Sequence, residues 1–428
     1  MAHKAQVAMT EVENERNPSY LTPNHPMLFV RSCSFAAPTM TPSVSPCLRG
    51  RFRRSIVAII YDSIVKKIRV RLGKNSYDVM IANGLLSRAG REINRLLPGK
   101  ASRVFVVTSP TVRRHWGEAL ERSLTKARMN YQVLEMNDGE PAKRLDTVER
   151  LAEQLVAAQA DRKSLVVALG GGVVGDCAGF LAAIFLRGIP VIQVPTTLLA
   201  QVDASIGGKT GVNLSAGKNL IGAFHQPRAV LVDPQVLSTL PAREFRAGLF
   251  ESLKCGVIRD RALFDFMVRK VRPILARDRR ALERVISDSI VVKAAVVSAD
   301  EKESDLRRIL NFGHTIGHAL EAATGYSEFL HGEAVGWGMA AAAAIAGSSG
   351  FCSPETTMQI TNAIEAYGPL PPVRSASGEI VGRLSADKKT VAGAVHFVLP
   401  IKIGKVTIAS DVPPDVIRQS VEQIRTHA

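Results

Sequence analysis

The chain of 428 residues is predicted to be an α/β protein with a second, mostly helical part. Between residues 66 and 233, short apolar runs of strand length alternate with helix-like stretches, which is typical of a mainly parallel sheet covered by helices on both faces. After residue 233 the strand-like runs almost vanish and long stretches of helical periodicity follow. We therefore expect a Rossmann-like domain over 66–233 and a helical domain over 234–428.

The strands of the first domain can be placed in chain order. The runs "KKIRVRL" (66–72) and "YDVMIANG" (77–84) alternate polar and apolar residues like paired edge strands. Buried strands are expected at "RVFVVTS" (103–109), "YQVLEM" (131–136), "SLVVALGGG" (164–172) and "VIQVPTT" (191–197), with a helix at about 145–159. Residues 195–227 are punctuated by glycine and are expected to form a long functional loop.

The second domain is predicted to be built from helices near 242–258, 261–272, 278–300, 306–323, 331–348 and 354–367. A short tail that includes "AVHFVLPIKIGKVTI" (394–408) follows them.

Residues 1–65 differ in composition from the rest of the chain. They carry many Pro and Ser residues, show little periodicity and include the basic run "LRGRFRR" (48–54). We expect this extension to be disordered or to result from translation at an upstream start. Its Arg- and Ser-rich second half also resembles an organellar transit peptide, so both interpretations stay open.

The net charge of +16 does not by itself indicate nucleic-acid binding. The basic residues are spread along the chain, and only six Tyr and two Trp are available for base stacking. No apolar run reaches the length of a membrane span, and the five cysteines form no CxxC pair. We expect a cytoplasmic protein that binds neither nucleic acid nor membranes.

A glycine-rich turn follows the third buried strand in "ALGGGVVGDCAGF" (168–180). Gly170, Gly172 and Gly175 satisfy the GxGxxG pattern, whose backbone N–H groups can approach a pyrophosphate. The acidic residue that would bind the ribose about twenty positions later is missing. The motif therefore indicates either a dinucleotide site of another pattern or a tight turn that needs small residues.

The glycine-punctuated segment 195–227 carries Asp203, Lys209, Lys218 and Asn219. Two lysines flanked by glycines suit recognition of a phosphate. The alternative is a solvated loop with two surface lysines.

Two histidines, His314 and His318, lie four residues apart on an expected helix and so point the same way, as metal ligands would. Thr315 stands where zinc peptidases carry their general base, which excludes that class. Nearby, Glu251 and Lys254 share one face of an otherwise apolar helix, and His331 follows in "LHGEA". A Glu with two His and an open position is the ligand set of catalytic zinc, although helical histidines bonded to backbone or carboxylate groups remain an alternative.

Residues 66–410 resemble the 3-dehydroquinate synthases of the sugar phosphate cyclase family. The resemblance rests on "DGEPAK" (138–143), "GGGVVGD" (170–176), "QVPTTLLAQVDASIGGKTGVN" (193–213), "GKNLIGAFHQP" (217–227), "ESLKCGVIRD" (251–260), "LNFGHTIGHALE" (310–321) and "LHGEAV" (330–335). It implies a nucleotide-binding first domain and a second domain that binds metal and substrate.

The resemblance also implies the role of individual residues. The implied metal ligands, for zinc or cobalt, are Glu251, His314 and His331, with His318 beside the metal. Catalytic roles fall to His318, Lys209, Lys254 and Asn219. The implied NAD-binding residues are Asp138, Glu140, Lys143, Gly171, Gly172, Val173, Val174, Gly175, Asp176, Thr196, Thr197, Lys209 and Lys218. The implied substrate-binding residues are Asp203, Lys209, Lys218, Asn219, Lys254, Lys293, Arg307, Asn311, His318 and Lys388, with Lys389 as an alternative to the last.

The family acts on a small phosphorylated keto acid, and its members are commonly homodimers. Its reaction oxidises a ring hydroxyl with NAD, eliminates phosphate, reduces the ketone again, opens the ring and closes a carbocycle by aldol addition. Another sugar phosphate cyclase is a rival interpretation, and so is a metal-dependent polyol dehydrogenase, which would release NADH. A non-catalytic relative that binds nucleotide or protein is a third.

Overall fold

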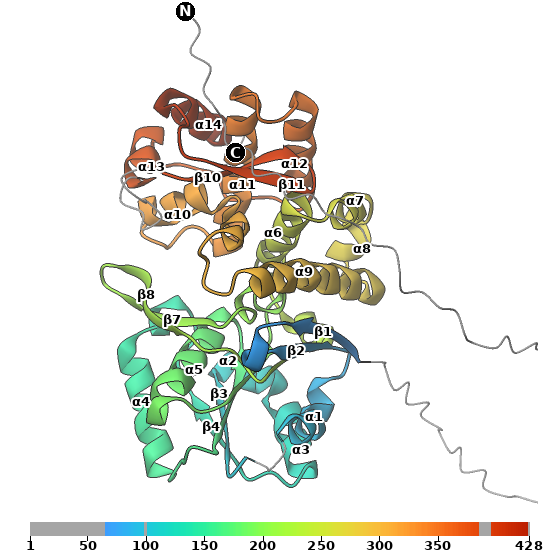
Figure 1. The fold of residues 1–428 in the computed structure, drawn as a ribbon, viewed down its shortest axis with the longest axis vertical. Helices are drawn as coiled ribbons and strands as arrows, with labels where there is room; N and C mark the ends of the chain where they lie inside the picture. Colours follow the sequence, from blue (N-terminus) through green and yellow to red (C-terminus); the bar gives the residue numbers. More distant parts are fainter. Residues whose placement is uncertain (1–64, 98–100, 385–394, 427–428) are drawn as a thin grey trace, which may run out of the picture. The chain divides into compact units, whose positions relative to one another are not determined.

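The computed structural model describes residues 65–97, 101–384 and 395–426 (Figure 1). The expectations for the N-terminal extension, residues 1–65, fall on residues 1–64 that lie outside the described residues, as do Lys388 and Lys389.

A seven-stranded sheet forms the centre of the first part of the chain, with the strand order β1-β2-β9-β6-β5-β3-β4 (Figure 1). Only the β1–β2 pair is antiparallel, and the other neighbours run parallel. The strands are β1 (Lys66–Val70), β2 (Tyr77–Ile81), β3 (Val104–Thr108), β4 (Tyr131–Glu135), β5 (Leu165–Gly170), β6 (Val191–Pro195) and β9 (Ala229–Val232). The six strands expected from the sequence are all present. The short strand β9 was not predicted, yet it joins the edge pair to the parallel strands.

Helices cover both faces of this sheet because its central strands are apolar on both sides. On β3, Val104 and Val106 pack in one core cluster and Phe105 and Val107 in another. The first cluster contains residues of α1 (Ala89–Leu96) and α3 (Glu118–Lys126), and the second contains residues of α4 (Leu145–Ala157) and α5 (Gly172–Ile184). This arrangement confirms the predicted doubly covered parallel sheet.

The expected loop over 195–227 is wrong for about half of its length, because a β-hairpin occupies residues 209–224. Strands β7 (Lys209–Leu214) and β8 (Gly217–Phe224) pair antiparallel, with Gly211 opposite Gly222. A Cβ atom on Gly222 would lie 2.2 Å from the Thr210 carbonyl oxygen, and one on Gly211 would lie 2.5 Å from that of Ile221. The glycines that suggested a loop therefore allow two backbones to approach closely.

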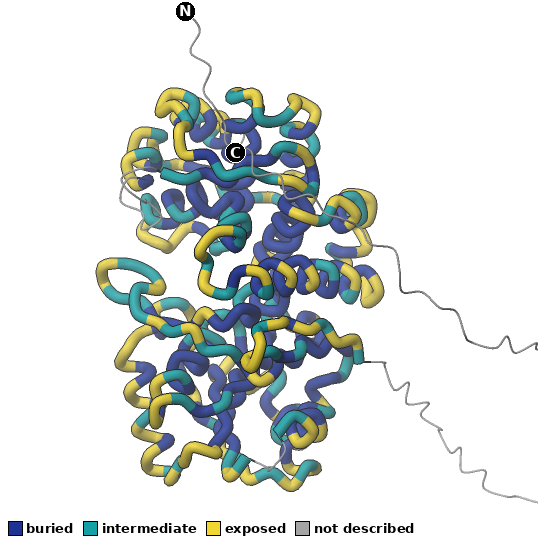
Figure 2. Tube along the Cα trace, in the orientation of Figure 1, coloured by how far each residue is buried: buried dark blue, intermediate teal, exposed yellow. Residues whose placement is uncertain are grey.

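The second part of the chain is mostly helical, as expected. Its α-helices are α6 (Ala242–Ile258), α7 (Arg261–Arg269), α8 (Val271–Leu275), α9 (Arg279–Ala299), α10 (His314–Ala323), α11 (His331–Ser348), α12 (Pro354–Ala366), α13 (Ser377–Leu384) and α14 (Pro414–Thr426). The tail expected at 394–408 contains the hairpin β10 (Phe397–Lys402) and β11 (Lys405–Ala409). Helices α6 and α11 are buried over almost their whole length (Figure 2).

One predicted helix, 306–323, is interrupted. A 3₁₀ turn, η8 (Leu306–Asn311), comes first, and α10 starts only at His314. Gly313 breaks the helix because its φ of +80° is left-handed, and a Cβ there would lie 2.7 Å from the Val335 carbonyl oxygen of α11. His314 consequently stands at the first turn of α10, against α11.

The two parts meet at the short helix η6 (Ala200–Ala204), which follows β6 and contacts both α6 and α9. Among the described residues, no helix is both long and apolar enough to cross a lipid bilayer.

Candidate active site

Three helices bring a carboxylate and three imidazoles together. Glu251 comes from α6, His314 and His318 from α10, and His331 from the first turn of α11. Glu251 Oε1 lies 3.7 Å from His314 Nε2 and 3.8 Å from His331 Nε2. One ring nitrogen from each of the three histidines lies within 4.8 Å of the others. The structure thus brings together all the residues that the sequence marked as metal ligands or their neighbours.

Two of the imidazoles are oriented from behind by hydrogen-bond acceptors. His314 Nδ1 donates to the Phe312 carbonyl oxygen at 3.2 Å, and His331 Nδ1 donates to Glu321 Oε2 at 3.2 Å. In the neutral form of each ring, Nδ1 therefore carries the proton and Nε2 presents its lone pair. Both Nε2 atoms face the same oxygen of Glu251, which is the geometry of ligands that share one cation.

Glu251 is a buried carboxylate whose oxygens have fewer hydrogen-bond partners than they can accept. Its side chain is 1% exposed and forms an ion pair with Lys254, but neither oxygen accepts a well-formed hydrogen bond from the described residues. A buried carboxylate in this condition is costly unless a cation joins it. The donor set of one carboxylate oxygen and two imidazole nitrogens fits a divalent metal with an open position.

A cluster of buried cations lies beside this set. Lys254 and Lys293 both face Asp203 of η6, and the Lys293–Asp203 pair is the closer of the two. Burial alone would lower the pKa of Lys254, but Glu251 and Asp203 together raise it above its usual value. At Lys293 the effect of burial outweighs the attraction of Asp203, so the pKa of Lys293 is lowered. The two lysines hold the pKa of Asp203 below its usual value. A buried site with this balance suits an anionic ligand.

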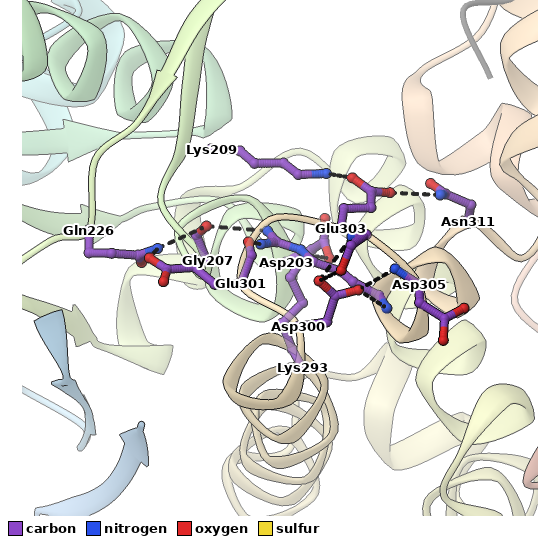
Figure 3. A network of polar contacts seen from close by, with 12 residues as sticks. Asp203, Gly207, Lys209, Gln226, Lys293, Asp300, Glu301, Glu303, Asp305 and Asn311 are labelled. Carbon is purple, nitrogen blue, oxygen red and sulfur yellow. Dashed lines mark hydrogen bonds and ion pairs between the residues drawn. The ribbon is translucent and has the colours of Figure 1, made fainter. Parts of the chain in front are cut away.

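The loop between α9 and η8 contacts further residues of the predicted substrate site, including Lys209 and Asn311 (Figure 3). Glu303 accepts hydrogen bonds from Lys209 and, at 2.8 Å, from Asn311 Nδ2. Arg307 is 2% exposed and donates to the carbonyl oxygens of Glu301 and Gly207, the latter at 3.2 Å. The loop therefore joins the hairpin strand β7 to η8 (Figure 3).

Several of the predicted nucleotide residues, among them Asp138, Gly171 and Thr197, follow the carboxyl ends of the parallel strands, whereas Lys209 and Lys218 lie on the hairpin strands β7 and β8. The chain leaves β3 toward β4 on one side and leaves β5 toward β6 on the other, so the sheet has a switch point between β3 and β5. Ligands of open α/β sheets bind at such points. Here Asp138 accepts a 2.8 Å hydrogen bond from Thr111 Oγ1, and Gly171 caps the N-terminus of α5. A Cβ on Gly171 would lie 2.9 Å from Thr197 Cγ2, so this turn needs a small residue.

The segment "DGEPAK" is tied to the hairpin. Lys143 Nζ donates to Asp176 of α5 and, at 2.5 Å, to Asn219 Oδ1 of β8. Glu140 Oε1 accepts from Asn213 Nδ2 at 2.8 Å. Although burial lowers it, the pKa of Lys143 is raised overall by the charges of Asp176 and Glu140. The glycine turn, the acidic segment and the hairpin thus form one connected site.

Three acidic residues of the site were not predicted from the sequence. Glu301 and Glu303 stand in "DEKESDLR", where the run of charges resembles a solvated loop, and Glu321 ends the motif "GHALE". Glu321 is 2% exposed and accepts from Lys218 and His331. Burial alone would raise the pKa of Glu321, but these two partners lower it to about 2. Its position one helical turn after His318 was the available signal.

The fold and the site together define an enzyme of the dehydroquinate synthase-like class, with a nucleotide-type sheet and a Glu/His metal centre. Family models match the 3-dehydroquinate synthase N-terminal domain over residues 133–247 and its C-terminal domain over 248–390. The chain belongs to the 3-dehydroquinate synthase family.

Curated relatives support this membership. The 3-dehydroquinate synthase of Koribacter versatilis is 53% identical over 361 residues, which cover 84% of this chain and 98% of that protein. That of Solibacter usitatus is 50% identical, covering 82% of this chain and 97% of the relative.

Solved structures share the fold. A 2-epi-5-epi-valiolone synthase from Streptomyces hygroscopicus, with NAD⁺ and Zn²⁺ bound, has a TM-score of 0.76 at 29% identity, covering 82% of this chain and 97% of that one. A 2-deoxy-scyllo-inosose synthase complexed with carbaglucose-6-phosphate, NAD⁺ and Co²⁺ also has a TM-score of 0.76, at 27% identity, with 84% and 99% covered. An iron-containing alcohol dehydrogenase shares the fold alone, with a TM-score of 0.59 at 15% identity.

The comparisons confirm the predicted fold class, the family and the prediction of an enzyme. They do not favour the alternative of a polyol dehydrogenase, because curated relatives at 46–53% identity are named 3-dehydroquinate synthase, whereas the alcohol dehydrogenase shares the fold at only 15% identity.

Proposed function

We propose that this chain converts 3-deoxy-D-arabino-heptulosonate 7-phosphate to 3-dehydroquinate and phosphate, a carbon–oxygen lyase step of the shikimate pathway that leads to aromatic amino acids. The observation that carries the proposal is the convergence of His314 Nε2 and His331 Nε2 on one buried oxygen of Glu251, at 3.7 and 3.8 Å. Buried lysines that suit an anionic substrate lie directly beside it. Relatives at 53% and 50% identity bear the name of this activity.

The metal ligands are Glu251, His314 and His331, and the cation is zinc or cobalt, as in the two solved cyclases with bound metal. Support comes from the two imidazoles whose Nδ1 atoms are occupied by acceptors. His318 lies beside the metal, and we assign it a proton relay because its ring contacts those of both His314 and His331, with centroids 5.4 and 5.8 Å away.

NAD is the cofactor, as in the same two structures. Its proposed site is the switch point of the sheet with the acidic segment and the hairpin, comprising Asp138, Glu140, Lys143, Gly171, Gly172, Val173, Val174, Gly175, Asp176, Thr196, Thr197, Lys209 and Lys218. The N-terminus of α5 supplies backbone N–H groups for the pyrophosphate. When bound, NAD would supply a reversible hydride acceptor and the divalent ion would supply a Lewis acid for the oxygen on which charge develops.

The chain's own residues bind and orient the anionic substrate. The proposed set is Asp203, Lys209, Lys218, Asn219, Lys254, Lys293, Arg307, Asn311, His318 and Lys388. Arg307 is held by two carbonyl oxygens, so its planar guanidinium is already fixed for a carboxylate or phosphate group. Lys254 keeps its proton because its pKa is raised, and it can stabilise negative charge on the substrate next to the metal. Among these residues, His318, Lys209, Lys254 and Asn219 are the ones we expect to touch the reacting atoms.

The domain division falls near residue 233, with the nucleotide-binding domain over 66–233 and the metal- and substrate-binding domain over 234–428. Strand β9 ends at Val232 and α6 begins at Ala242, which supports this division.

We further propose a homodimer in the cytoplasm. Cys177, Cys255 and Cys352 are free thiols, which suits a reducing compartment.

Incubating purified full-length protein with the seven-carbon keto acid phosphate, catalytic NAD and zinc tests the proposal. Phosphate release and NADH absorbance are followed together. Phosphate released over many turnovers without net NADH is the expected result, and Glu251→Ala should abolish it. Stoichiometric NADH would instead indicate a dehydrogenase, and no phosphate at all with intact zinc binding would indicate a non-catalytic relative. Chelator-treated protein, restored by zinc, serves as the matched control.

A further inference from the structure

Glu321 is a buried carboxylate near the end of α10 to which no role in the reaction has yet been given. Its side chain is only 3% exposed. A buried charge needs partners, and Glu321 has two on different elements. Its Oε1 accepts from Lys218 Nζ of β8 at 2.8 Å, and its Oε2 accepts from His331 Nδ1 of α11 at 3.2 Å.

The hydrogen bond to Glu321 decides how His331 can act. Because a carboxylate only accepts, the proton of the neutral imidazole is held on Nδ1 and the lone pair is left on Nε2. That Nε2 faces Glu251 Oε1 at 3.8 Å. His331 is also the more exposed of the two proposed histidine ligands, since its side chain is 34% exposed against 10% for His314. Packing therefore holds the His331 ring less firmly than the His314 ring, so the hydrogen bond to Glu321 contributes more to its orientation.

Lys218 in turn holds Glu321. Its Nζ lies between the Glu321 carboxylate and the Tyr326 ring, whose centroid is 4.5 Å away. The ion pair neutralises the buried carboxylate and links α10 to the hairpin strand β8. A chain of three side chains consequently runs from the hairpin through Glu321 to the metal centre.

We propose that Glu321 is a positioning residue for the metal site, fixing the tautomer and orientation of His331, and that Lys218 keeps Glu321 in place. This inference rests on the proposed metal ligands Glu251, His314 and His331. Carboxylates that orient a ligating histidine in this way strengthen metal binding, and their loss commonly weakens it about 10–100-fold.

The test measures zinc affinity of the full-length protein by competition with a chromophoric chelator, so that no turnover is needed. Glu321→Ala, which removes the acceptor, should weaken zinc binding about 10–100-fold. Glu321→Gln keeps an acceptor oxygen and should lose less. Lys218→Met should lose less than Glu321→Ala, because the carboxylate can still reach His331. The d–d spectrum of the cobalt-loaded protein should change in Glu321→Ala.

Glu333→Gln is the matched control. Glu333 lies on the same helix as His331, is 5% exposed and is ion-paired with Arg243. Its side chain, however, accepts a hydrogen bond from the backbone N–H of the N-cap residue of the helix. Its loss should lower stability and leave zinc affinity unchanged. If Glu321→Ala binds zinc as tightly as the parent, or if Glu333→Gln weakens binding equally, the positioning role is wrong. If His331→Ala retains full zinc affinity, the ligand assignment itself fails and the inference falls with it.

Discussion

Replacing Gly207 by alanine should damage both folding and substrate binding. Gly207 has a φ of +98°, and a Cβ atom on it would lie 2.4 Å from Arg307 Nη2 and 3.0 Å from Val297 Cγ2. Arg307 cannot swing away freely, because it is 2% exposed and donates to the carbonyl oxygens of Gly207 and Glu301. The glycine therefore makes room for the guanidinium that the proposed substrate site needs.

The size of the effect follows from two contributions. A non-glycine residue held at such a φ costs about 1–3 kcal/mol. Displacing the guanidinium weakens a charged hydrogen bond in a buried site, worth about 1.5–3 kcal/mol. We expect Gly207→Ala to lower the free energy of unfolding by about 2.5–6 kcal/mol, the sum of the two contributions. The KM for the phosphorylated substrate should rise, because Arg307 is displaced from its fixed position.

Equilibrium urea unfolding and steady-state kinetics give both quantities. Gly404→Ala is the matched control, since Gly404 has a similar φ of +90° but the nearest atom to its added Cβ, Arg261 N, is 3.4 Å away. The control should show only the backbone cost of about 1–3 kcal/mol and an unchanged KM. If the two variants lose the same stability and both keep the parent KM, the steric argument for Arg307 is refuted.

Three further predictions follow from buried charges and thiols. Glu251→Gln removes the nearer of the two carboxylates that face the fully buried Lys254 and leaves only Asp203, so metal-free protein should lose at most about 5 kcal/mol in urea unfolding; unchanged stability would contradict the ion pair. Burial favours protonation of Asp300, but hydrogen bonds from Arg307 N, Asp305 N and Ser304 hold its pKa below the usual 3.8, so its stabilising effect is present above pH 4 and is lost as the pH falls further. Asp300→Asn should therefore show a shallower loss of stability on acidification than the parent, and parallel acid-unfolding curves would count against this. Burial raises the pKa of Cys177 and of Cys255 to about 12, so neither thiol should react with a thiol reagent at pH 8 until the protein unfolds, whereas labelling of either in folded protein would disprove their burial.

The positions of most strands and helices could be predicted because the signal is local. A run such as "SLVVALG" or the periodicity of α6 and α11 lies within a few residues, and burial of those side chains is decided by the element they form. Where local signals conflict, prediction failed. Glycines at 211 and 222 indicated a loop, but their role depends on a partner strand, and Gly313 ended a helix whose periodicity continued.

The same distinction between local signals and distant partners applies to the candidate active site. The types of residue, their motifs and the family were available from the sequence alone, including Glu251, His314 and His331. The partners of those residues were not. Glu321 meets Lys218 across 103 residues, and β9 enters the sheet between β2 and β6, far from either along the chain.

The sequence by itself therefore determined which elements form and which chemistry the chain carries, because periodicity and motifs are encoded over short stretches. Only the tertiary structure decided which charges face one another, since the path of the chain sets the distance between residues that are remote in sequence. The pairing of Glu321 with His331 and Lys218 exists only once α10, α11 and the hairpin are packed together, and the space that Gly207 leaves for Arg307 exists only once η8 packs against the segment before β7.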